Sequence, residues 1–93
     1  MKVKVCFIGA LSWLAGKDKV SLELEEGSDV LTALRELCER CPHLSQALFD
    51  ADTGDPRTNF LVLLNGRDVD VLGGLSAVLK DGDVLTLIPL MRL

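Results

Sequence analysis

The chain begins with a segment in which apolar and polar positions alternate. Valine or phenylalanine occupies positions 3, 5 and 7, and lysine or cysteine occupies the positions between them. A period of two residues is typical of a β-strand, because successive side chains of a strand point to opposite faces. The pattern predicts a first strand over Lys2 to Ile8. The same alternation at Val20, Leu22 and Leu24 predicts a second strand whose other face is polar.

After a polar break, the apolar residues recur every three or four positions. This spacing is that of an amphipathic helix, whose apolar stripe faces a core. Ser28 or Asp29 can cap its first turn. Pro42 ends it, because proline has no N–H to donate and restricts the residue before it. One more short turn is expected over His43 to Phe49. The apolar stripe consists of Val30, Leu34, Leu37 and Cys41.

Turn signals divide the rest of the chain into short pieces. Residues 50–58 are polar, with a glycine and a proline, and are typical of a mobile loop. Asn59 to Leu64 is the most apolar stretch and too short for a helix, so it predicts a buried strand that ends at the turn Asn65-Gly66. The other expected elements are a turn-rich link over residues 9–19, a brief edge strand at Val69–Leu72, a tight connection at Gly73-Gly74, a turn at Asp81–Asp83 and a last strand at Val84–Ile88.

The order of these elements is two strands, a helix and two or three further strands. With 93 residues, of which 48% are hydrophobic, the chain can bury a core of its own. We expect residues 1–93 to form a single α+β domain, in which a mixed sheet of four or five strands packs on one main helix. Trp13, in the apolar part of the first link, is expected to anchor the core or its rim.

Charge and hydropathy exclude some classes of partner. Lysines precede an apolar stretch at the N-terminus, as in a signal peptide, but the alternation there indicates a strand. No apolar run approaches the roughly 20 residues of a membrane helix. We therefore expect a cytoplasmic protein with no membrane contact. The net charge is −4 and no Lys/Arg cluster is present, so nucleic acid is not an expected partner.

Candidate reactive groups are few. Three cysteines in an intracellular chain indicate free thiols. Cys38 and Cys41 lack the second pair of a zinc site and lie at a helix end, where a thiol pKa is not lowered. Pro42 separates them from His43, whereas haem attachment needs an adjacent histidine. We expect Cys41 to pack in the core and Cys38 to be partly covered. No nucleophile–base set stands out, so no catalytic residue, metal or cofactor is predicted.

The element order and several motifs resemble a known family. Strand, strand, helix, strand, turn, strand is the order of the ubiquitin-like β-grasp. The stretch LVLLNGRDVDVLGGLSAVLKDGDVLTLIPL resembles the end of the MoaD/ThiS family of small sulfur carriers, with Asn65-Gly66, a Leu-x-Asp-Gly-Asp turn at residues 79–83, and Ile88-Pro89. KVCFIGALSWLAG and LRELCERCPHL are also similar to the family. The resemblance covers nearly the whole chain and is closest to the MoaD branch, the small subunit of molybdopterin synthase.

The C-terminal tail departs from the family pattern. Family carriers end in Gly-Gly, and an activating enzyme adenylates the terminal carboxylate before sulfur replaces one of its oxygens. The resemblance makes the tail the site of this chemistry, but here it reads Pro89, Leu90, Met91, Arg92 and Leu93. The internal Gly73-Gly74 pair is no substitute. Because a branched side chain would collide in a channel shaped for glycine, we expect the chain as written to be a poor substrate for adenylation.

The resemblance also implies a docking surface. Alternation places Ile8 and Ile88 on the face of the sheet away from the helix, together with Leu61 and Leu63. The first and last strands are neighbours in the β-grasp, so the two isoleucines should lie close together beside the tail. Such an exposed aliphatic patch resembles the surface by which family members engage partner enzymes. Ordinary exposed aliphatic residues, with no binding role, are the alternative.

Two classes of function follow. The first is a MoaD-type sulfur carrier, whose partners are a larger synthase subunit and an ATP-dependent activating enzyme. The second is a ubiquitin-like interaction module that binds or regulates without conjugation, which the missing Gly-Gly favours. A cysteine-based redox protein is a third option. In the first two classes the chain is a protein on which enzymes act, and is not itself an enzyme.

Overall fold

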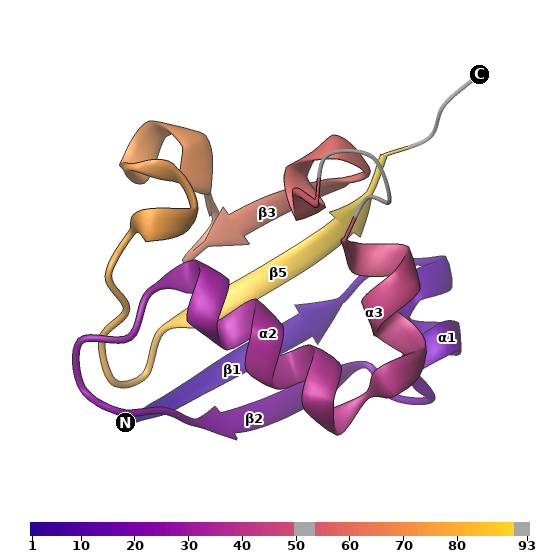
Figure 1. Ribbon diagram of the computed structural model, residues 1–93, viewed down its shortest axis with the longest axis horizontal. Coiled ribbons are helices and arrows are strands. Elements are labelled where there is room, and N and C mark those ends of the chain that lie inside the picture. Colours follow the sequence, from indigo (N-terminus) through magenta and orange to yellow (C-terminus); the bar gives the residue numbers. More distant parts are fainter. Residues whose placement is uncertain (50–53, 91–93) are drawn as a thin grey trace.

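A computed structural model describes residues 1–49 and 54–90 of the chain. Its centre is one five-stranded sheet in the order β2-β1-β5-β3-β4 (Figure 1). β1 and β5 are parallel and the other neighbouring pairs are antiparallel, so the sheet is mixed, as expected. The strands are β1 (Lys2–Phe7), β2 (Lys19–Glu23), β3 (Phe60–Leu64), β4 (Arg67–Asp68) and β5 (Val84–Pro89).

The main helix is α2 (Val30–Arg40), which crosses one face of the sheet. Its start was predicted correctly, because the side chain of Asp29 accepts a hydrogen bond from the Thr32 N–H at 2.8 Å. Cys41 follows its last turn, and Pro42 begins the next helix, as proline can at a first helical position. That helix, α3 (Pro42–Leu48), is longer than the single turn expected there.

The core lies between the helices and the inner face of the sheet. Along each strand the buried positions alternate with more exposed ones, as the period of two predicts. Helix α2 contributes Val30, Leu34 and Leu37, all fully buried. The strands contribute Val3, Val5, Phe7, Leu22, Phe60, Val62, Leu64, Leu85 and Leu87. The predicted inward faces of the first, middle and last strands are therefore confirmed.

The link between β1 and β2 differs from the prediction. It contains a short helix, α1 (Ala10–Ala15), instead of turns alone. Leu11 is its buried residue, and Gly16 ends it in the left-handed conformation (φ 73°). Trp13 is 84% exposed, so the prediction that it anchors the core or its rim is wrong. The reason is helical geometry: two residues correspond to about 200° of rotation, which turns Trp13 away from the side that Leu11 buries.

The segment after β3 also differs in detail. Asn65 and Gly66 have φ of 51° and 84°, the left-handed values that a tight hairpin turn requires. The edge strand expected at Val69–Leu72 lies earlier, at β4, and Val69–Leu72 is a 3₁₀ helix (η2). Asp68 causes the change, because its side chain accepts the Asp70 N–H at 2.9 Å and caps the turn. A second 3₁₀ turn, η3 (Gly74–Ser76), follows.

None of the helices in the two described ranges is long and apolar enough to cross a bilayer.

Candidate docking surface

The outer face of the sheet brings the predicted docking residues together. Leu61 on β3 lies opposite Ile88 on β5. Phe7 on β1 lies beside Leu87 on β5, and Ile8 and Ile88 directly follow these two residues. The Ile8 N–H also donates to the Leu87 carbonyl at 3.1 Å. One end of the outer face is therefore a row of aliphatic side chains across three neighbouring strands. We call Ile8, Leu61, Leu63 and Ile88 the aliphatic patch.

The members of the aliphatic patch are only partly covered. Ile8 is 46% exposed, and Leu61, Leu63 and Ile88 are half-buried. Leu63 pairs with Thr86 in the next row of the sheet, and Cys6 lies on the other side of Thr86. The fold thus leaves a continuous apolar strip at solvent. Its use in docking stays a prediction.

The tail leaves the sheet beside this patch. β5 ends at Pro89, and the Leu90 N–H donates to the Asn59 carbonyl at 2.9 Å. Pro89 is half-buried and Leu90 is 47% exposed. The other predicted tail residues, Met91, Arg92 and Leu93, lie outside the described residues. The aliphatic patch and the start of the tail therefore occupy the same end of the sheet, which is the arrangement expected of a docking surface that presents a chain end.

Lysines occupy the rest of the outer face on the β2 side. Lys4 pairs with Ser21 across the strands, Lys19 pairs with Cys6, and Lys2 pairs with Glu23. All three lysine side chains are exposed, and within the described ranges none forms an ion pair. The outer face is thus aliphatic at the end of β5 and positively charged toward β2. This charge pattern was not recognised in the sequence, although alternating lysines in the first strand were visible there.

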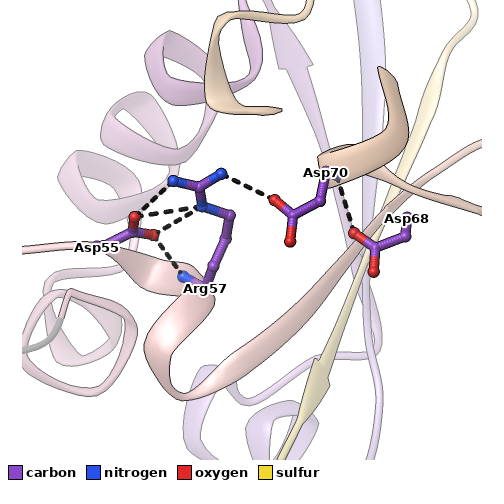
Figure 2. A network of polar contacts seen from close by, with 4 residues as sticks. All are labelled: Asp55, Arg57, Asp68 and Asp70. Carbon is purple, nitrogen blue, oxygen red and sulfur yellow. Dashed lines mark hydrogen bonds and ion pairs between the residues drawn. The ribbon is translucent and has the colours of Figure 1, made fainter. Parts of the chain in front are cut away.

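A cluster of charged side chains connects the loops on the β3–β4 side of the sheet (Figure 2). Arg57, in the 3₁₀ turn η1 (Pro56–Thr58), donates to Asp55 through Nη2 at 2.7 Å and Nε at 3.0 Å. Its Nη1 donates to Asp70 of η2 at 2.8 Å. The Asp55 side chain also accepts the Arg57 backbone N–H at 2.8 Å. The loop that was expected to be mobile is therefore fixed, from Asp55 onward, to η2.

Each charged group in this cluster favours the charged form of its partner. The Arg57 guanidinium, by donating to Asp55, holds the pKa of that carboxyl below its ordinary value, although partial burial opposes the effect. The two carboxylates, Asp55 first and then Asp70, raise the pKa of Arg57 above its already high value. A side chain at Gly74 would be disfavoured, because φ is 73° there and a Cβ would lie 3.1 Å from Nη1 of Arg57. The cluster joins η1 to η2. Gly73-Gly74 is the connection between η2 and the next turn.

The sequence reasoning missed this cluster, although one signal for it was present. Asp55-Pro56 is the pairing of a capping carboxylate with a proline at the first helical position, which marks the start of a helical turn. The loop prediction for residues 50–58 was based on their polar composition alone and did not use this signal. Contact between Arg57 and Asp70 was not expected, because Val69–Leu72 was incorrectly predicted to be a strand.

The cysteines show no reactive arrangement. All three are free and half-buried, so Cys41 lies against the core and not within it as expected. Burial, with a smaller contribution from Cys41, raises the pKa of the Cys38 thiol, which disfavours the thiolate. In the part of the chain that the structure describes, no group of three or more His, Cys, Asp or Glu side chains could hold a metal ion.

Comparison with known proteins identifies relatives over the whole domain. The sequence model of the ThiS family matches residues 5–92. Small archaeal modifier protein 1 of Haloferax volcanii has the same fold, with a TM-score of 0.85, 26% identity, and coverage of 97% of this chain and 98% of that one. No protein of curated function matches significantly.

Two further solved structures are similar. A putative molybdopterin converting factor, subunit 1, from Pyrococcus furiosus is 29% identical, with a TM-score of 0.76 over 98% of this chain and 99% of that one. A chain of the BexX/CysO complex of Amycolatopsis orientalis is also 29% identical, with a TM-score of 0.74 and 97% coverage of both chains. The resemblance to ubiquitin-like β-grasp carriers stated from the motifs is confirmed.

Proposed function

The chain belongs to the ThiS family, and from this premise we propose that it is a MoaD-type sulfur-carrier protein that docks on a larger synthase subunit through the aliphatic patch. The similarity to a small archaeal modifier protein supports a carrier role over a catalytic one. The relative from Pyrococcus furiosus, named as a molybdopterin converting factor subunit, supports the molybdopterin branch. The relative in the BexX/CysO complex supports docking on another protein.

The observation that carries the proposal is the position of the aliphatic patch. Ile8, Leu61 and Ile88 form a partly exposed row on the sheet face away from the helices, at the end of the sheet from which the tail departs. A partner that covers this row holds the start of the tail at its own surface. Burial of aliphatic side chains stabilises such a complex by about 25 cal/mol per Å² of apolar area removed from water, before the costs of association. This burial favours docking of a partner on the aliphatic patch. The chemistry of the tail then determines whether the docked chain carries sulfur.

Carriage of sulfur requires conversion of the terminal carboxylate to a thiocarboxylate by an activating enzyme. The test is to incubate the chain with the activating enzyme of the same genome, ATP and a sulfur donor, and to weigh the intact protein. A form of the chain extended by Gly-Gly after Leu93 is the matched positive control. We expect the extended form to gain the mass of one oxygen-to-sulfur exchange and the unextended form to react poorly.

A non-conjugating interaction module is the second candidate, favoured by the absence of glycine from residues 89–93. Such a module would bind the larger partner through the same patch, but neither form would acquire sulfur. Absence of exchange in both forms, with partner binding intact, would therefore replace the carrier proposal by this one. Absence of binding to the larger synthase subunit would overturn both.

A further inference from the structure

Trp13 is the most exposed large apolar side chain in the described ranges and the only tryptophan of the chain. Helix α1 is anchored to the core through Leu11, which is 3% exposed, so the fold does not use the indole for packing. A tryptophan presents roughly 150–250 Å² of surface, most of which here remains in water. Exposed single aliphatic residues are common, but an indole left at solvent on a short, anchored helix is a candidate for binding.

Other exposed apolar residues lie at the same end of the molecule as Trp13. Of the six large hydrophobic residues exposed in the described ranges, four lie at this end of the molecule: Ile8, Trp13, Leu14 and Leu90. Leu14 and Pro89 line the same shallow cavity of about 160 Å³ between α1, α3, β3 and β5. Helix α1 thus contacts β5. Ile8, a member of the aliphatic patch, immediately precedes Gly9 and α1, so the patch and α1 lie at the same end of the sheet.

The segment that follows Trp13 in the chain, residues 17–19, carries two positive charges and one negative charge. Lys17 lies four residues after Trp13, and Lys19 begins β2; both are exposed and neither forms an ion pair with a described residue. Asp18, between them, is exposed and offsets one of these charges. Four of the five lysines of the chain lie within residues 2–19, although the net charge of the whole chain is −4. A surface that complements this region presents carboxylates around an apolar site.

We propose that Trp13 is an anchor of the interface with the larger synthase subunit, and that it enters an apolar pocket of that subunit rimmed by carboxylates. The inference rests on the proposed function and extends its docking surface from the aliphatic patch over α1. Tryptophan is enriched among the few interface residues whose truncation costs most of the affinity, because it removes a large rigid surface from water with little loss of side-chain freedom. Lys17 and Lys19 then provide long-range attraction and orientation.

The single tryptophan makes a direct test possible. Fluorine-labelled tryptophan incorporated into the chain gives one fluorine resonance, which is followed while the unlabelled larger synthase subunit is added. We expect that resonance to shift and to lose its sensitivity to replacement of H₂O by D₂O. Trp13→Ala should weaken binding roughly 30-fold, whereas Val71→Ala should leave it unchanged. Val71 is the matched control because it is 77% exposed and lies in η2, outside this surface.

The charged rim is tested separately. Lys17→Glu should slow association and flatten its dependence on salt, because Lys17 would no longer attract an acidic partner. Arg35→Glu is the matched control, since it changes the net charge by the same amount from an exposed position on α2. Circular dichroism and urea unfolding of each variant establish that the fold is retained, as expected for exposed positions.

Three results would contradict the inference. Binding of the subunit with an unchanged fluorine resonance and an unaffected Trp13→Ala variant would overturn the role of Trp13 and leave the proposed function intact. A resonance that shifts with the concentration of the chain alone would show that a second copy covers the indole. Failure of the unmodified chain to bind the subunit would overturn the proposed function, and the inference with it.

Discussion

The two faces of the sheet are built from the same strands but differ in what depends on them. On the inner face, Val5, Leu85 and Leu87 are fully buried beneath the helices. On the outer face, Ile8 and Ile88 remain partly at solvent, although they are as apolar as the inner residues. Burial of the inner face therefore stabilises the fold. The aliphatic side chains of the outer face stay partly in water and contribute less to that stability. Such surplus apolar surface on one face is a sign of binding.

If the two faces differ in this way, substitutions on the inner face should have the largest effect on stability. Leu85→Ala removes a fully buried side chain from β5, so it should lower the free energy of unfolding by about 2 to 5 kcal/mol. Urea unfolding followed by circular dichroism measures this loss. Thr86→Ala, at the next position and on the outer face, is the control and should change stability little. Equal effects of the two substitutions would mean that the faces are not energetically distinct.

The next effect concerns binding by the outer face. Ile88→Asp places a charge in the middle of the aliphatic patch, and should weaken binding to the larger synthase subunit by about 2 kcal/mol, roughly 30-fold. Isothermal titration calorimetry measures the affinity, and the variant should remain folded because Ile88 is only half-buried. Val71→Asp, away from the patch, should bind normally. A folded Ile88→Asp protein with normal affinity would remove the aliphatic patch from the interface.

The smallest effect is expected away from both faces, in the cluster around Arg57. Asp55→Asn should lower stability by about 1 kcal/mol, because it weakens hydrogen bonds to a charged group at partly exposed positions. The folded-state pKa of Asp55 is lowered, so its contribution is present above the unfolded value of about 3.9 and is lost as the pH falls through the folded value. The stability difference between wild type and Asp55→Asn should therefore shrink in acid.

Urea unfolding at a series of pH values between neutrality and strong acid measures that difference. Asp18→Asn is the control, since Asp18 is exposed and its side chain has no hydrogen bond or ion pair to any residue that the structure describes. A difference between wild type and Asp55→Asn that stays constant, or grows, as the pH falls would show that the Asp55–Arg57 contact does not stabilise the fold. Affinity for the partner should not change in either variant.

Periodic segments were predictable from the sequence because one face of each is buried. The alternation in β1, β2 and β5 gave their inner residues, and the stripe of α2 with Asp29 and Pro42 gave its limits. The same logic placed Ile8 and Ile88 on the outer face. Their neighbourhood followed from the resemblance to the β-grasp, since a parallel pairing of the first and last strands cannot be read from periodicity alone.

Short, non-periodic segments were not predictable in the same way. Six residues give α1 too few positions to display a helical period, and hydrophobicity alone suggested that Trp13 would be buried. In Val69–Leu72 the β-branched residues favoured a strand, whereas the local cap from Asp68 produced a 3₁₀ turn. The contact of Arg57 with Asp70 joins two loops distant in sequence, so no local pattern could reveal it.

The central claim, that the outer sheet face beside the tail is the docking surface, is tested most directly by mapping the partner's footprint. The chain is labelled at its isoleucine and leucine methyl groups, and the larger synthase subunit is added unlabelled while the methyl resonances are recorded. The account predicts that Ile8, Leu61, Leu63 and Ile88 shift together at the stoichiometry of binding. Shifts confined to leucines on the helical side that are only partly buried, such as Leu31 of α2, with the four outer-face residues unchanged, would contradict it.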